Sequence, residues 1–336
     1  MIHSPVLIIG CARSGTTLLY NLLSEVPLLW SIGGESKTII ERYHSPEVKN
    51  WVSGELGAED LTAESAAFMR RQFLEQVAPG DFWRRVNRLR RWLNGNGLYK
   101  AVKQHGRQES QGAALSSAVP GAGLSVFCRI AELRNRLLPT VGPIRLLEKT
   151  PENCLRLPFL AALFPDARVI YLTRDGRANI HSLVEGWRQP HLFPGYQTPV
   201  PVTSAGQARG RWAFTLISGW QELVSSPLEA ISARQWVASN QAVLDYMEQP
   251  GALPVLTIRF EDLVAVPGLT LARIGEFLEL SPQMMPVIDD ALPEVNAVSA
   301  PDLEKWRREA EAIMRVSPII EPMMKRLGYD LREDNT

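Results

Sequence analysis

The sequence predicts an α/β fold in which helices cover a parallel sheet. Two stretches carry this prediction, because each contains an apolar run, a short turn and a helical pattern; one begins at residue 6 and the other at residue 167. A third apolar run, residues 255–258, has the length of a further buried strand. Strands that alternate with helices are typical of parallel sheets with right-handed crossovers.

The first unit lies at the N-terminus. Residues 6–9 are all apolar, as expected for a strand that is buried on both faces. Residues 10–15 begin and end with glycine and predict a tight turn. Residues 16–23 place apolar side chains at helical spacing. This segment is therefore expected to run from strand to loop to helix.

The second unit repeats the pattern. Residues 155–164 predict an apolar helix that ends at a proline and an aspartate, and residues 167–172 predict a buried strand. Residues 174–176 make a turn, and residues 177–187 predict the next helix.

Other regions are less regular. Residues 60–95 predict arginine-rich helices, and residues 302–328 predict a helical tail that ends near Gly328. Two stretches rich in glycine, serine or proline, residues 106–125 and 188–206, predict loops. Long loops of this kind often line binding sites.

Composition limits the class of protein. The chain has 336 residues, of which 45% are hydrophobic and 21% are charged, so a sizeable core can form. Lysine plus arginine and aspartate plus glutamate each total 36, so net charge gives no argument for a nucleic-acid or membrane partner. Cys11, Cys128 and Cys154 fit no disulfide or metal framework. Without a signal peptide or an apolar run of ~20 residues, we expect a soluble cytoplasmic protein.

The turn at Gly10–Gly15 has the spacing of a phosphate-binding P-loop but lacks its lysine. Thr16 stands directly after the last glycine, where an ATPase has lysine, and the cation lies earlier, at Arg13. Backbone N–H groups, a helix N-terminus and the hydroxyls of Thr16 and Thr17 can still bind an anion. The alternative is a tight turn that binds no ligand.

A second arginine follows the strand at residues 167–172. Arg174 can bind a phosphate with two hydrogen bonds, and Ser182 lies eight residues later on the predicted helix. That distance is about two helical turns, so a loop must fold back toward Ser182. A salt-bridged arginine and an exposed serine are the alternative. This strand ends in Thr173 and Arg174, whereas a kinase strand ends in an aspartate that binds Mg²⁺.

These two motifs together resemble those of sulfotransferases that use 3′-phosphoadenosine-5′-phosphosulfate (PAPS) as sulfuryl donor. The resemblance implies a P-loop-NTPase-like parallel sheet of about five strands, PAPS as co-substrate, PAP (3′-phosphoadenosine-5′-phosphate) as product, and no metal. It places the 5′-phosphosulfate on the loop residues and the 3′-phosphate on Arg174 and Ser182. Ala12 stands where the family usually has proline. The loop residues so assigned are Arg13, Ser14, Gly15, Thr16 and Thr17.

Residues 148–151, Glu-Lys-Thr-Pro, make the sequence similar to the tyrosylprotein sulfotransferase branch and its bacterial relatives. Many cytosolic members have a catalytic histidine where Pro151 stands. In the similar branch a glutamate shortly after the phosphate loop is the proposed base, which implies Glu35 here, with Lys149 as a second cation on the sulfuryl group. The alternative for Glu35 is an acid at a helix start. His105 is interpreted as a loop histidine.

The resemblance continues to the C-terminus. Residues 259–263 match a strand end that helps to close the nucleotide pocket, and residues 305–306 and 326–330 match the last helix and tail. Asn296 stands where some relatives have a nucleotide-binding lysine, and Ser299 is an alternative contact. We therefore expect a single domain over residues 1–336.

The insertions of about residues 45–130 and 188–206 have no match and are expected to shape the acceptor site. The implied reaction is direct in-line transfer to a hydroxyl of a tyrosine peptide, a phenolic small molecule or a sugar. A kinase-type P-loop protein and a non-catalytic PAP-binding module are the alternatives, and a homodimer stays open. Arginines between Arg84 and Arg91 form either a solvated helix face or a surface that attracts an acidic acceptor.

Overall fold

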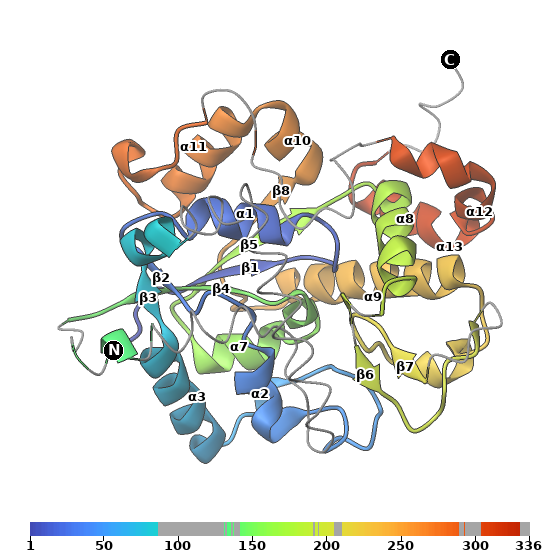
Figure 1. Ribbon diagram of the computed structural model, residues 1–336, viewed down its shortest axis with the longest axis horizontal. Coiled ribbons are helices and arrows are strands. Elements are labelled where there is room, and N and C mark those ends of the chain that lie inside the picture. The colour runs from blue at the N-terminus through green and yellow to red at the C-terminus, as the bar shows by residue number, and fades with distance from the viewer. Residues whose placement is uncertain are drawn as a thin grey trace, which may run out of the picture.

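A sheet runs through the centre of the computed structural model and separates two layers of helices (Figure 1). The structure describes residues 1–86, 131, 133–135, 137, 142–190, 192–193, 195–204, 210–288, 292 and 304–329.

Within these residues the sheet has six strands in the order β3-β2-β4-β1-β5-β8. All neighbours pair in parallel except β3, which pairs antiparallel with β2. The prediction of a parallel sheet of about five strands is confirmed, and β3, only two residues long, extends it at one edge. The strands are β1 (Val6–Ile9), β2 (Leu29–Ser31), β3 (Ala78–Pro79), β4 (Arg145–Lys149), β5 (Arg168–Thr173) and β8 (Val255–Arg259).

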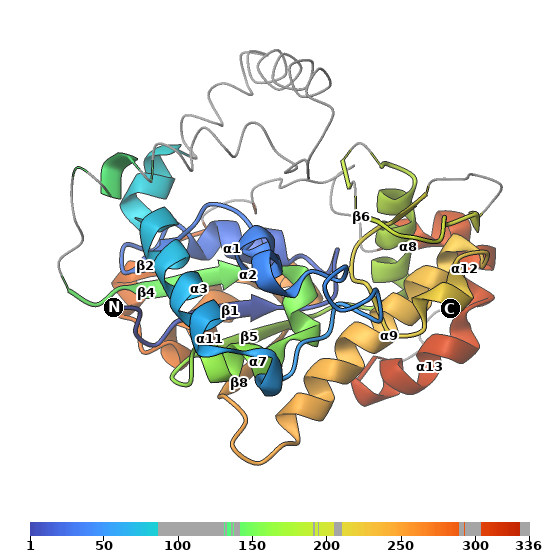
Figure 2. The ribbon, with the colours of Figure 1, turned by 90° about the horizontal axis from the view of Figure 1, so that it is seen from below.

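One face of the sheet is covered by α1 (Thr16–Leu23), α10 (Phe260–Ala265) and α11 (Pro267–Phe277). The opposite face packs on a larger set of helices (Figures 1 and 2). These are α2 (Lys37–His44), α3 (Ala63–Gln76), α7 (Leu157–Leu163) and α9 (Leu228–Met247), while α8 (Gly176–Trp187) and α13 (Ser317–Arg326) pack against α9 beyond the strand ends.

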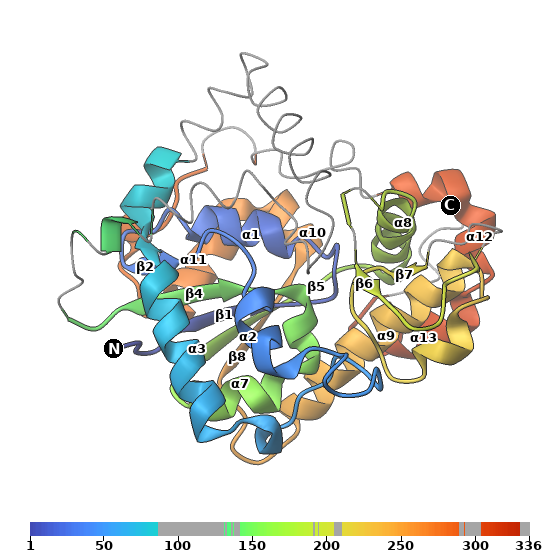
Figure 3. The ribbon, with the colours of Figure 1, turned by 60° about the horizontal axis from the view of Figure 1, so that its bottom comes forward.

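Shorter elements complete the described part. A hairpin of β6 (Tyr196–Gln197) and β7 (Arg211–Trp212) lies near α8, as Figure 3 shows. Further short helices are η1 (Ala58–Asp60), η2 (Pro151–Leu155), η4 (Trp220–Leu223), η5 (Pro282–Met284), η6 (Lys305–Glu309) and α12 (Ala310–Met314), and residues 80–86 are also helical.

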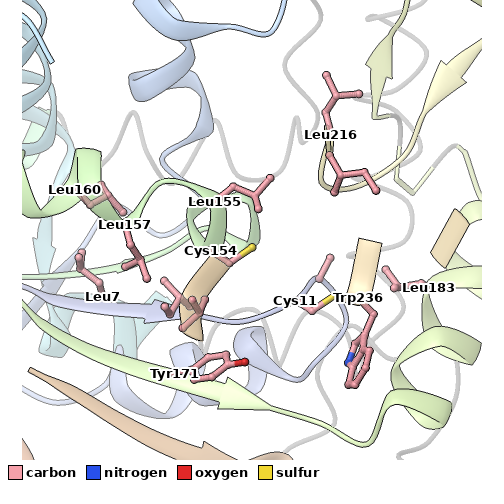
Figure 4. Packing of buried hydrophobic residues seen from close by; sticks show 14 of the residues in the cluster. Leu7, Cys11, Cys154, Leu155, Leu157, Leu160, Tyr171, Leu183, Leu216 and Trp236 are labelled. Atoms are coloured by element: carbon pink, nitrogen blue, oxygen red, sulfur yellow. The ribbon is translucent and has the colours of Figure 1, made fainter. Parts of the chain in front are cut away.

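The central strands are buried on both faces. In β1, Val6 and Ile8 belong to the core under α1, whereas Leu7 and Ile9 belong to the core on the other face. This alternation follows from the two-residue period of a strand. Figure 4 shows Leu7, Tyr171 and Leu157 of α7 in the hydrophobic core on the face opposite α1. The all-apolar run at residues 6–9 is therefore explained by helices on both sides.

Several predicted elements differ in detail. The predicted helical tail over residues 302–328 is confirmed in its described part, which consists of three helices, η6, α12 and α13, with Pro318 in the first turn of α13. The predicted loop over residues 188–206 contains β6. Residues 155–164 form the end of η2 and then α7, which begins beside Pro158. Residues 106–125 lie outside the described residues.

No helix among the described residues is long and apolar enough to cross a membrane. The first insertion contributes η1, α3 and β3, so part of it belongs to the sheet and its cover.

A buried ion pair joins three of these elements. The side chain of Arg156, which follows η2, is fully buried, and its Nη2 atom donates to Oε1 of Glu41 in α2 at 2.7 Å. Its Nε atom donates to the carbonyl oxygen of Gly54 at 3.0 Å. The hydroxyl of Tyr196 in β6 donates to the same glutamate at 2.7 Å. Glu41 therefore connects α2, η2 and the hairpin.

Removal of Glu41 should destabilise the fold, because it leaves a buried, unpaired guanidinium. We expect Glu41→Ala to lower the free energy of unfolding by about 3–5 kcal/mol. Urea denaturation followed by circular dichroism measures this value. The matched control is the double variant Glu41→Leu/Arg156→Met, which removes both charges and should recover most of the loss. Equal stability of the two variants would show that the unpaired charge is not the cause.

Candidate functional site

The residues predicted to bind phosphate gather at the carboxyl ends of β1, β4 and β5. The chain crosses to β2 and β4 on one side of β1 and then to β5 on the other, so β1 marks the point where strand order reverses. Open α/β sheets bind ligands in the crevice at this point. The loop Gly10–Gly15, Lys149 and Arg174 follow or end these three strands.

The loop after β1 needs its glycines. Gly15 has φ 99°, and a Cβ atom there would lie 2.3 Å from the ring of Phe260. A Cβ atom on Gly10 would lie 2.4 Å from the carbonyl oxygen of Leu172 in β5. Arg13, a non-glycine residue, has φ 70°, a conformation that costs about 1–3 kcal/mol and is most often kept at functional sites.

The loop places several hydrogen-bond donors together at the N-terminus of α1. The first N–H groups of α1 have no partner inside the helix, and no side chain caps it. The buried Ser14 Oγ atom has no hydrogen-bond partner among the described residues. Thr16 is buried and Thr17 is half-buried at the same helix start. An anion at the start of α1 would satisfy these donors.

Arg174 reaches this loop from the end of β5. Its Nη1 atom donates to the carbonyl oxygen of Arg13 at 2.9 Å, and its guanidinium lies 4.7 Å from the ring centre of Phe260. Its Nε atom is buried without a partner in the described part of the chain. Burial lowers the pKa of Arg174 to about 10, although Glu261 opposes the shift. A nearby anion would relieve this cost.

Helix α8 holds the other side of the loop. Ser182 Oγ accepts a hydrogen bond from Nε of Arg13 at 3.2 Å, and Asn179 Nδ2 donates to the carbonyl oxygen of Ala12 at 2.9 Å. The loop thus folds back toward Ser182. Sequence reasoning gave Asn179 no role, although it precedes Ser182 by three residues and shares its helix face. Asp175 caps the helix by accepting from the N–H of Arg177.

One aromatic ring lies over Arg13. Its guanidinium lies 5.0 Å from the ring centre of Phe193, which lies 5.2 Å from that of Phe214. Burial lowers the pKa of Arg13, and Glu185 opposes the shift. Among the described residues, no carboxylate forms an ion pair with Arg13 or Arg174.

The predicted base and second cation form a separate pair. Lys149 Nζ donates to Oε1 of Glu35 at 2.6 Å, and 42% of the Glu35 side chain is exposed against 6% of the Lys149 side chain. Lys149 is the register partner of Ile8, two residues before Gly10. Its ammonium lies 5.8 Å from the ring centre of Tyr20 in α1. The pair therefore lies beside the loop, without a hydrogen bond to Arg13 in the described part of the chain.

The matched C-terminal motifs close around the Arg174 turn. Glu261 accepts hydrogen bonds from the N–H of Asp175 at 3.0 Å and from the hydroxyl of Tyr329 at 2.9 Å. Trp306 lies against Arg177, with 4.7 Å between the guanidinium and the ring centre. The strand end after β8 and the tail tyrosine thus hold the turn that carries Arg174.

Other predicted residues lie elsewhere. Arg84, whose side chain is 42% exposed, pairs with Asp81 at 3.3 Å and donates to the carbonyl oxygen of Glu25 at 2.6 Å. No group of three or more potential metal ligands occurs among the residues that the structure describes. His105, Arg88, Arg90, Arg91, Cys128, Asn296 and Ser299 lie outside the described residues.

Comparison with known proteins gives the following similarities. A model of the Sulfotransferase family matches residues 5–283. Protein-tyrosine sulfotransferase A of Caenorhabditis elegans is 25% identical over 202 residues, which are 55% of this chain and 45% of that protein. The chain thus matches about half of the length of this relative.

Two solved structures extend over almost the whole chain. The sulfotransferase domain from the curacin biosynthetic pathway has 17% identity and a TM-score of 0.44, covering 98% of this chain and 99% of the other. A sulfotransferase from Alicyclobacillus acidocaldarius has 13% identity and a TM-score of 0.45, with 98% of each chain covered.

The substitution Gly15→Ala should disrupt the anion site, because its Cβ atom would strike Phe260 and its φ is unfavourable for alanine. If PAP is the ligand, as the sequence resemblance implies, its affinity should fall by about 10- to 100-fold, the equivalent of 1–3 kcal/mol of strain. Isothermal titration calorimetry measures the affinity. Gly268→Ala in α11 is the control, since its Cβ atom would meet nothing within 4 Å. Unchanged affinity of Gly15→Ala would contradict the assigned site.

Proposed function

Because the chain belongs to the Sulfotransferase family, we propose that it transfers the sulfuryl group of PAPS to the hydroxyl of an acceptor. One observation supports PAPS as donor above all: Arg174 and Ser182 both contact Arg13 of the P-loop-like turn. Arg174 and Ser182, which are 161 and 169 residues from Arg13 in the chain, thus form one basic site with the loop. A nucleotide with phosphate groups at both its 5′ and 3′ positions suits such a site.

The unsatisfied donors support this fit. Ser14 Oγ and the N–H groups at the start of α1 would bind the 5′-phosphosulfate, with the hydroxyls of Thr16 and Thr17 beside them. Arg174, whose Nε atom is buried and unsatisfied, and Ser182 would bind the 3′-phosphate. Arg13 lies between the two groups and cannot give up its proton at physiological pH, so its part is to stabilise negative charge.

The acceptor would approach from the side of Glu35. In the proposed reaction its oxygen bonds to sulfur while the bond from sulfur to the 5′-phosphate oxygen breaks. The hydroxyl proton passes to Glu35, and PAP leaves without a covalent enzyme intermediate. Lys149, buried beside Glu35, adds a second cation for charge on the transferred group.

For the acceptor we propose a class of hydroxyl rather than a single compound. The named activity of the Caenorhabditis elegans relative supports a tyrosine hydroxyl, and a phenol or a sugar hydroxyl fits the same chemistry. Phe193, from the insertion at residues 188–206, covers Arg13 at 5.0 Å. This contact supports a role for that insertion at the acceptor side of the site.

A carboxylate that accepts the proton should be essential for turnover but not for nucleotide binding. We expect Glu35→Gln to lower kcat by about 10²- to 10⁴-fold and to leave PAP affinity within about twofold. Release of PAP from PAPS, measured with tyrosine peptides, simple phenols and sugars as acceptors, gives kcat. The exposed variant Glu47→Gln is the control. Full turnover by Glu35→Gln would remove Glu35 from the mechanism.

The same assay separates the alternative functions. PAP binding without PAPS consumption on any acceptor would support a non-catalytic binding module. ATP turnover that depends on Mg²⁺ would support a kinase, although Thr16 occupies the position of the kinase lysine.

Recognition of the 3′-phosphate can be tested with two ligands. The intact protein should bind PAP more tightly than adenosine 5′-phosphate, which lacks the 3′-phosphate. In Arg174→Ala this preference should fall by about 10- to 100-fold, the value of a charge-assisted hydrogen bond. Calorimetry with both nucleotides measures the ratio, and the exposed Arg234→Ala variant in α9 is the control. A preference that survives in Arg174→Ala would place the 3′-phosphate elsewhere.

A further inference from the structure

A second carboxylate lies directly behind the pair of Glu35 and Lys149. Glu148, the residue before Lys149 in β4, has 1% of its surface exposed. It accepts hydrogen bonds from Ser36 Oγ at 2.6 Å and Thr150 Oγ1 at 2.6 Å on one oxygen, and from Asn153 Nδ2 at 2.9 Å on the other. Its surroundings thus supply donors on both carboxylate oxygens.

These bonds connect the loop that carries Glu35 to the strand that carries Lys149. Ser36 follows Glu35, and its N–H donates to Thr150 Oγ1 at 2.8 Å while its hydroxyl binds Glu148. Glu35 is therefore bound to Lys149, and Ser36 is bound to the residues on either side of Lys149. The ion pair of the partly exposed Glu35 and the buried Lys149 lies next to a buried network that can hold it in place.

Three potential donors surround the Glu148 carboxyl group. A carboxylate accepts only, and its three partners, two hydroxyls and an amide, can all donate to it. Burial raises the pKa of Glu148, while the bonds from Ser36, Thr150 and Asn153 oppose this shift. This buried acidic side chain takes no direct part in the proposed reaction, and its burial is tolerated because such a network satisfies it.

We propose that Glu148 is a positioning residue that holds Glu35 and Lys149 in the arrangement required for sulfuryl transfer. The inference rests on the proposed function, in which Glu35 accepts the proton. In-line transfer needs the base close to the acceptor hydroxyl, and a misplacement of about 1 Å can cost about 100-fold in rate. Glu148 acts on the reaction only through Ser36 and the end of β4.

The structure also offers a conservative substitution. Asn153 Oδ1 is buried and has no hydrogen-bond partner among the described residues. In Glu148→Gln the new amide can donate to this oxygen after a rotation of Asn153, while the glutamine oxygen still accepts from Ser36 and Thr150. Glu148→Gln thus keeps the network, and Glu148→Ala removes it.

We expect Glu148→Ala to lower kcat by about 100-fold with PAP affinity within about threefold of the original value. Glu148→Gln should recover kcat to within about fivefold. Tyr171→Phe is the control for loss of a buried hydrogen bond, since the Tyr171 hydroxyl donates to Asn240 Oδ1 at 2.6 Å away from this network. It should lower the melting temperature but not kcat. Turnover of PAPS gives kcat, calorimetric titration with PAP gives the affinity, and thermal unfolding gives the melting temperature.

The outcomes separate this inference from others. Unchanged kcat in Glu148→Ala would overturn it, and so would a parallel loss of PAP affinity and kcat, which indicates a merely structural role. If Glu148→Ala does not fold, Ser36→Ala replaces it; a loss of about tenfold in kcat with intact PAP binding supports the proposal, and no loss overturns it. Full activity of Glu35→Gln would instead refute the proposed base, whatever the Glu148 variants do.

Discussion

The hydrogen bond from the partly buried Arg174 guanidinium to the backbone carbonyl of Arg13 joins the parts on which the site depends. Through it the turn after β5 fixes the loop after β1, where strand order reverses. The strained backbone of Arg13 persists because its neighbours hold it from two sides: Arg174 binds its carbonyl, and Ser182 binds its side chain. Glu261 and Tyr329 then hold the turn itself.

The same contact explains why composition reveals nothing of the site. The chain has no net charge, yet two arginines meet at one loop in a place where burial disfavours their charged forms. The desolvation of the two guanidiniums is unfavourable only at this loop. A polyanion bound there would interact strongly with both of them, because the environment is poorly solvated. The net charge of the whole chain therefore does not reveal a local basic site of this kind.

The sequence predicts the elements whose signal is local. The helix at residues 16–23 matches α1 residue for residue, because a small-residue turn precedes it and an apolar stripe runs along it. The sequence does not predict strand β4, because its last two residues, Glu148 and Lys149, are charged and break the apolar run. They are buried because distant residues bind them. The spacing of Arg174 and Ser182 indicated their motif, but the contact of Asn179 with Ala12 depends on a loop 167 residues away.

The site therefore consists of two halves with different supports. Arg13, Arg174 and Ser182 are held by α8 and the turn after β5, whereas Glu35 and Lys149 are held by β4 and the network of Glu148. The proposed in-line transfer would require both halves to keep a fixed distance. The described hydrogen bonds do not link them directly, but the pairing of β1 with β4 does, since it sets Lys149 beside Ile8, two residues before the loop. The rigidity of the central sheet is thus what relates the donor to the acceptor.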